Sequence, residues 1–149
     1  MAWDEEMNIM TRVWVNDSAA TKYDDDRLNQ AILMSMMVVQ MEIDFDNTYE
    51  INMVQETVTP DPTISPYRDT DFMTLATIKT ACVIDRGSAS DAAGQALRVK
   101  DGQSEVDLRD RFKAQLELLK SGWCSVYEDL KDKYILGQRG NILGAAVLS

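Results

Sequence analysis

The first 16 residues place apolar and polar positions with the period of an α-helix. Large apolar side chains are spaced by four, three and four residues, which puts them on one helix face. They are Trp3, Met7, Met10 and Trp14. We therefore predict a helix over about residues 3–16, ended by the turn-forming triplet Asn-Asp-Ser.

A second apolar pattern predicts a longer helix from about Arg27 to Phe45. Three aspartates, Asp24, Asp25 and Asp26, precede it, where carboxylates accept the free N–H groups of a helix start and oppose its positive end. Two apolar stripes run along this segment. One is Leu28, Ile32, Met36, Val39 and Ile43, and the other is Ala31, Met34, Val38, Met41 and Phe45. A helix that is apolar nearly all round must be covered on more than one side, so we expect it at the centre of the domain or at a contact with a second subunit.

The period then changes to two. Tyr49, Ile51 and Met53 alternate with outward positions, which predicts a strand with one buried face. All three prolines fall within residues 60–66. This composition predicts an extended, stiff connector inside one domain.

The second half of the chain predicts three more helices and a β-hairpin. The first of these helices covers about residues 69–86, ends at Gly87 and has five inward side chains: Phe72, Leu75, Ile78, Cys82 and Val83. The hairpin covers about residues 96–108 and turns at Asp101-Gly102-Gln103-Ser104. The last two helices begin near Phe112 and Trp123 and end at Gly122 and Gly137.

These elements predict a mainly α protein of about five helices with a small β element. A chain of 149 residues is the size of one domain, which we place at residues 1–137. Residues 138–149 form an apolar C-terminal tail that is too short and too interrupted by glycine to pack as a helix alone. Its apolar side chains are Ile142, Leu143, Val147 and Leu148. Burying each would contribute roughly 1.5–3 kcal/mol, close to the cost of ordering the segment, so we expect the tail to become ordered on a docking partner.

Charge is divided unevenly along the chain. Residues 1–62 hold 13 acids and 3 bases, whereas residues 63–149 hold 12 of each. A surface that grips DNA, RNA or an anionic membrane needs clustered Lys and Arg, so this balance argues against one. A negative wall can still stand beside DNA, because it repels the backbone and lets it slide.

Catalytic chemistry finds little support in the sequence. The chain has no histidine, which removes the commonest general acid and base, and it lacks the G-x-S-x-G, P-loop and Cys-x-x-Cys patterns. The segment from Asp44 begins like a calcium loop, but Tyr49 replaces the required glycine. An aspartate-dependent metal enzyme is the weakest alternative, and we expect no enzyme activity, no cofactor and no metal. Cys82 and Cys124 are predicted to be reduced, buried thiols in a cytosolic environment, and neither a signal peptide nor a membrane span is expected.

The methionines of the second helix allow two interpretations. Met34, Met36, Met37 and Met41 fill an irregular core or form an adaptable docking surface, and the two interpretations merge if the helix lies at a subunit boundary. Tryptophan is a common core anchor and is also enriched at interfaces. We predict a subunit interface at four residues: Met34, Met37, Met41 and Trp3.

Several segments, taken in order, resemble the small head–tail connector proteins of tailed bacteriophages. Those that carry the resemblance are Met1–Asp4, Thr11–Val13, Val15–Asp17, Lys22–Leu28, Phe45–Tyr49, Thr59–Pro62, Leu75–Cys82 with Asp85, Val99–Asp107, and Gly122–Cys124 with Tyr127. Relatives often carry Gly-Pro-Cys where this chain has Trp123, so the last helix start departs from the pattern.

The resemblance implies a virion structural protein located in the neck, between capsid and tail, and made in the host cytoplasm. Such adaptors form a homo-oligomeric, usually dodecameric ring under the portal protein, extend the DNA channel and bind the next neck or tail protein. DNA passes through without sequence-specific binding, the tail docks on the portal, and no membrane is involved. We expect some of five acids to line the channel, and the candidates are Asp24, Asp25, Asp26, Asp44 and Asp46. The alternatives are another neck component, such as a stopper or tail-completion protein, and an acidic, DNA-mimicking regulatory protein.

Overall fold

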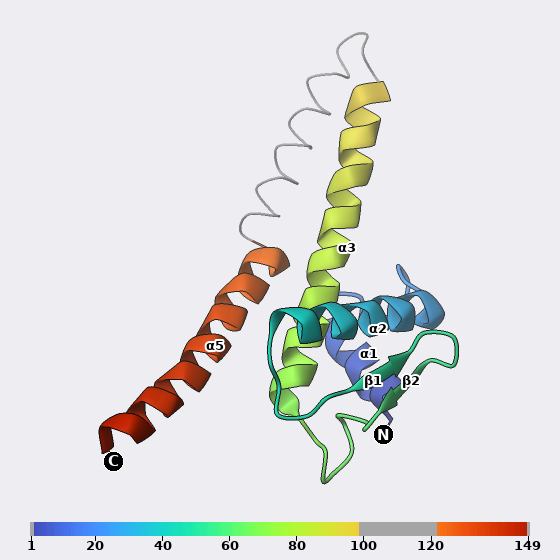
Figure 1. The fold of residues 1–149 in the computed structure, drawn as a ribbon. Coiled ribbons are helices and arrows are strands. Elements are labelled where there is room, and N and C mark those ends of the chain that lie inside the picture. The colour runs from blue at the N-terminus through green and yellow to red at the C-terminus, as the bar shows by residue number, and fades with distance from the viewer. Residues whose placement is uncertain (1, 99–121, 149) are drawn as a thin grey trace.

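The computed structural model describes residues 2–98 and 122–148, with the side chains of residues 2–87 and 122–138. The described chain is a mainly helical single domain with one small antiparallel sheet, as the sequence predicts. Its elements are α1 (Trp3–Trp14), α2 (Asp25–Glu42), β1 (Glu50–Asn52), β2 (Thr57–Thr59), α3 (Thr70–Arg98) and α5 (Trp123–Leu148). Figure 1 shows α1, α2 and the sheet gathered around the N-terminal half of α3, whose other half extends beyond them.

The two N-terminal helices form where the periodicity predicts them. Asp24 caps α2 by accepting a hydrogen bond from the Arg27 N–H at 2.7 Å, which satisfies one of the unpaired donors of the helix start. The loop between the helices is built around Asp17, which is buried and accepts backbone N–H groups from residues 21, 22 and 23. Arg12 joins this loop to α2 through ion pairs with Asp17 at 2.9 Å and Asp25 at 2.7 Å.

The core lies between α1, α2, the N-terminal half of α3 and the start of α5. One predicted stripe of α2 is buried along its length, from Leu28 to Ile43. Opposite it on α3 are Phe72, Leu75 and Ile78, which the sequence also predicts to face inward. The prediction that α2 packs into the core is therefore confirmed for one of its two apolar stripes.

The small sheet is a hairpin within residues 50–59, where Ile51 pairs with Val58. The alternation predicted for this strand is confirmed, because Tyr49 is buried while Glu50 and Asn52 are exposed. Tyr49 stacks on Phe72 with ring centroids 4.1 Å apart, and this contact fixes the hairpin on α3.

The hairpin predicted over residues 96–108 is wrong at its start, because Leu97 and Arg98 continue α3. Residues 99–108 and the helix predicted near Phe112 lie outside the described residues. Gly87 does not end α3, and Gly137 does not end α5. A glycine inside a helix costs only about 1 kcal/mol relative to alanine, so a single glycine does not by itself end a helix. The tail expected at residues 138–149 is consequently part of α5 up to Leu148.

The prediction of two reduced thiols is also wrong. Cys82 of α3 and Cys124 of α5 form a disulfide across 42 residues of sequence, with their Cα atoms 4.5 Å apart. Two cysteines in separate predicted helices give no sign of their distance, which is set by the packing of α5 on α3. Beside the disulfide, Asp85 accepts a hydrogen bond from the Trp123 N–H at 3.4 Å, and burial of the carboxyl raises the pKa of Asp85.

Candidate functional site

The outward side of α2 carries the three methionines predicted at a subunit interface. Met34, Met37 and Met41 are 51%, 40% and 86% exposed, although their helix contributes much of the core. Methionine side chains are flexible and polarisable, so a cluster of them on a surface adapts readily to a partner. This methionine face is the most apolar part of the exposed surface of α2.

The fourth residue predicted at the interface lies elsewhere. Trp3 is only 6% exposed and packs with Met7 in the core of its own chain. Its backbone N–H donates to Asp61 at 3.0 Å, which joins the start of α1 to the proline-rich connector. Trp3 follows the inward stripe of α1, so its assignment to a subunit interface is corrected.

The five predicted channel acids form two groups. Asp24, Asp25 and Asp26 lie at the start of α2, whereas Asp44 and Asp46 follow its end. An 18-residue helix is about 27 Å long, so the two groups are separated by roughly that length. All five residues are exposed, and Asp25 pairs with Arg12. Their position in a channel stays a prediction.

The four apolar tail residues, from Ile142 to Leu148, belong to the last turns of α5. Their side chains lie outside the described ones. Figure 1 shows the C-terminal end of α5 clear of α1, α2 and α3. The docking role of these residues stays a prediction, now on a helix rather than on an irregular tail.

A groove runs between α2 and α3, beside the methionine face. It consists of two hollows of about 440 and 420 Å³ that share Arg27, Ala31 and Val83. Tyr23, Ile84 and Gly87 complete the first hollow, and Met34, Val38 and Met53 help to line the second. We call this surface the α2–α3 groove.

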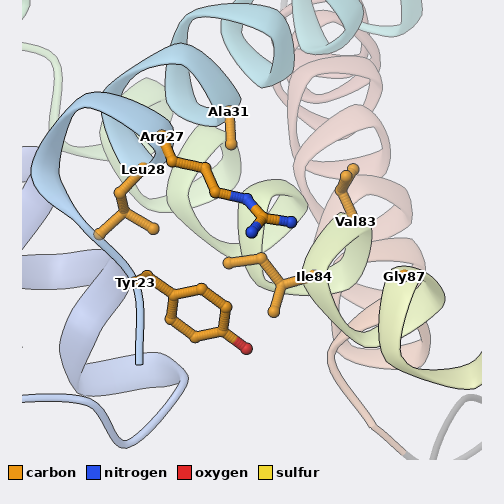
Figure 2. Close-up of a pocket in the computed structure, with 7 residues that line it drawn as sticks. All are labelled: Tyr23, Arg27, Leu28, Ala31, Val83, Ile84 and Gly87. Carbon is orange, nitrogen blue, oxygen red and sulfur yellow. The ribbon is translucent and has the colours of Figure 1, made fainter. Parts of the chain in front are cut away.

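The α2–α3 groove is lined largely by apolar side chains and by two cations, Arg27 and the Lys79 that pairs with Glu42. Figure 2 shows the Arg27 side chain reaching from α2 toward Val83 and Ile84 of α3, with the ring of Tyr23 at one end of the hollow. Within the part of the chain that the structure describes, the Arg27 guanidinium forms no ion pair and the Tyr23 hydroxyl no hydrogen bond. The groove also contains the Ser35 hydroxyl, which is buried and has no partner among the described residues.

Polar contacts fix the two walls of the groove relative to each other. Glu42, at the end of α2, lies 3.6 Å from the Lys79 ammonium group of α3 and 3.3 Å from that of Lys131 on α5. The Tyr127 hydroxyl donates to the same carboxylate at 2.7 Å. Burial by itself would raise the pKa of Glu42, but the hydrogen bond from Tyr127 and the two lysines outweigh it, so this pKa is lowered. The groove is thus pre-formed by contacts that hold α2, α3 and α5 together.

Only part of this surface follows from the sequence. Ala31, Met34 and Val38 belong to the second apolar stripe predicted on α2, and the structure leaves that stripe partly exposed, as a contact surface requires. Val83, which the sequence places inward, is about half exposed and forms the opposite wall. The prediction that Val83 is buried is therefore wrong, because this side chain faces a hollow instead of the packed core. No sequence pattern points to Arg27 as a groove residue.

Among the described residues, no group of three or more Cys, Asp or Glu side chains is arranged to hold a metal ion. None of the described helices combines the length and the apolar character that crossing a membrane requires. Comparison with protein-family models, with curated proteins and with solved structures finds no match.

Proposed function

We propose that this chain is a structural protein of a bacteriophage virion, a head-to-tail adaptor that forms an oligomeric ring between the portal and the downstream neck or tail proteins. The observation that carries the proposal is the uncovered apolar surface of α2. Met34, Met37 and Met41 stay exposed on a helix whose opposite side closes the core. A contiguous apolar patch on a folded domain is typical of a protein interaction site.

Repeated copies of the chain are the partner that best accounts for this surface. Covering three exposed methionines by a neighbour would remove apolar area from water at about 25 cal/mol per Å², which is the main driving force of association. The contacts of Glu42 with Lys79 and Lys131 join α2 to α3 and α5, and a surface on joined helices needs little ordering on assembly.

Charge supports a position beside DNA without binding to it. The acids at both ends of α2 are exposed, and in a ring they would give a lumen a negative wall. Such a wall repels phosphate groups and does not hold the duplex in place.

The end of α5 supplies a second contact in this proposal. It lies clear of the described body, and its sequence is apolar from Ile142 to Leu148. We assign this end to the portal protein, which would leave the methionine face for contacts between copies.

The proposal is tested by the size of the full-length protein in sedimentation velocity, alone and mixed with the portal protein. We expect self-association or recruitment onto the portal, and we expect Met41→Glu to weaken it at least about ten-fold, because a charge would be buried without a partner. Val54→Glu is the matched control, since Val54 is equally apolar and highly exposed but lies in the hairpin turn. A wild-type chain that stays monomeric and does not bind the portal protein would contradict the proposal. If this chain binds a basic DNA-binding protein instead, that result would favour an acidic DNA mimic.

A further inference from the structure

The outward side of α1 carries a second unpartnered surface. Ile9 and Val13 are 53% and 59% exposed, although both are aliphatic. Together with Glu5 they are spaced by four residues, so the three lie one above another on the same helix face. We call Glu5, Ile9 and Val13 the α1 outer stripe. Glu5 forms no ion pair within the described chain, so the stripe has two apolar side chains and a free carboxylate at one end.

The α2–α3 groove has the complementary features. Ala31, Met34 and Val83 offer an apolar floor and walls, and the Arg27 guanidinium, which lines both hollows, forms no ion pair among the described residues. The groove is also long enough to hold the stripe. Glu5 to Val13 spans about 12 Å along α1, and Arg27 to Val38 spans about 16 Å along α2.

The stripe and the groove lie on opposite flanks of α2. Ile9 lines a hollow with Asn29, whereas Ala31 lines the groove. Two residues along a helix correspond to a rotation of about 200°, so these positions face nearly opposite directions. A copy therefore cannot place its own stripe in its own groove, but it can place it in the groove of a neighbour.

We propose that the α1 outer stripe of one copy docks in the α2–α3 groove of the next copy of this chain, with Glu5 facing Arg27. The contact is heterologous, because each copy gives a stripe on one side and a groove on the other, and such contacts generate a ring when the rotation closes. This inference rests on the proposed ring function and names the surfaces that build it. The apolar pairs supply the binding energy, while the Glu5 and Arg27 charges set the register.

Charge reversal tests the pairing in the full-length protein. Arg27→Glu and Glu5→Lys each place like charges opposite one another, and we expect each to weaken self-association at least about ten-fold in sedimentation velocity, with or without the portal. The double variant R27E/E5K restores opposite charges at every contact, and we expect it to return to within about three-fold of the wild type. Lys133→Glu and Glu50→Lys, which make the same charge changes at exposed sites elsewhere, are the matched controls.

The charge-reversal variant at position 27 is expected to fold. A glutamate at position 27 follows the N-cap Asp24 by three residues, a position where acids favour a helix start. Far-UV circular dichroism and thermal unfolding check each variant, and Val13→Ser, with Val54→Ser as its control, probes the apolar part of the stripe without any charge change.

The outcomes separate the two proposals. Weakening by the single reversals with recovery in the double variant supports the stripe-in-groove contact. Self-association or portal recruitment that is unchanged by either reversal overturns the contact and leaves the adaptor function standing, as does weakening without recovery. A wild-type chain that neither associates nor binds the portal overturns both.

Discussion

At the scale of single residues, the polar contacts of Glu42 join α2 to both α3 and α5. Its carboxylate accepts a hydrogen bond from Tyr127 and faces the ammonium groups of Lys79 and Lys131. Lys79 is nearly buried and lies 4.6 Å from the centre of the Tyr127 ring. Removing the carboxylate charge would leave Lys79 without an anion in a place that water barely reaches, which is costly.

We predict that Glu42→Gln lowers the free energy of unfolding by about 1–2 kcal/mol at neutral pH, measured by urea denaturation. The pKa of Glu42 is lowered on folding from its ordinary value of 4.5, so its contribution is complete above that pH and is lost as the pH falls through the folded-state value. The difference between wild type and variant should therefore shrink below about pH 4.5. Glu50→Gln, at an exposed site, is the control and should change stability by less than about 0.5 kcal/mol. An equal loss in both variants, or a difference independent of pH, would contradict this role of Glu42.

At the scale of elements, the sequence predicts what local patterns determine and misses what tertiary packing determines. Helices α1 and α2 follow from their apolar periodicity, and the capping role of Asp24 follows from its position before α2. The ends assigned to Gly87 and Gly137 are wrong because a single glycine costs a helix only about 1 kcal/mol, which tertiary packing can override. Only one wall of the α2–α3 groove could be predicted. The apolar stripe on α2 follows from the sequence pattern, whereas the opposite wall at Val83 does not, because the same pattern places Val83 in the core.

The disulfide between α3 and α5 carries its own prediction. It closes a loop across 42 residues, and such a constraint on the unfolded chain typically contributes about 2–4 kcal/mol. We expect the double variant Cys82→Ala/Cys124→Ala to unfold at correspondingly lower urea concentration than the oxidised wild type. Reductant should lower the wild-type midpoint toward that of the variant and leave the variant unchanged. If reductant leaves the urea midpoint of the wild type unchanged, the disulfide does not stabilise the fold.

At the scale of the whole molecule, the described chain combines a closed core with uncovered apolar surfaces. The core is complete without a partner, since Trp3, Tyr49 and Tyr127 are buried within one copy. Two of these surfaces are the methionine face with its adjoining groove and the outer stripe of α1. The two apolar stripes of α2 indicate that both sides of this helix need a packing partner. Which side stays exposed in one copy depends on how α3 and α5 pack against it.

The central claim, that copies of this chain assemble through these surfaces into a ring on the portal, is tested most directly by electron cryomicroscopy of the full-length protein bound to the portal protein. We predict a closed ring in which Met34, Met37 and Met41 lie at boundaries between copies and the acids at the ends of α2 line the lumen. A bound chain that contacts no second copy, or a ring whose outer wall carries the methionine face in open solvent, would contradict the account.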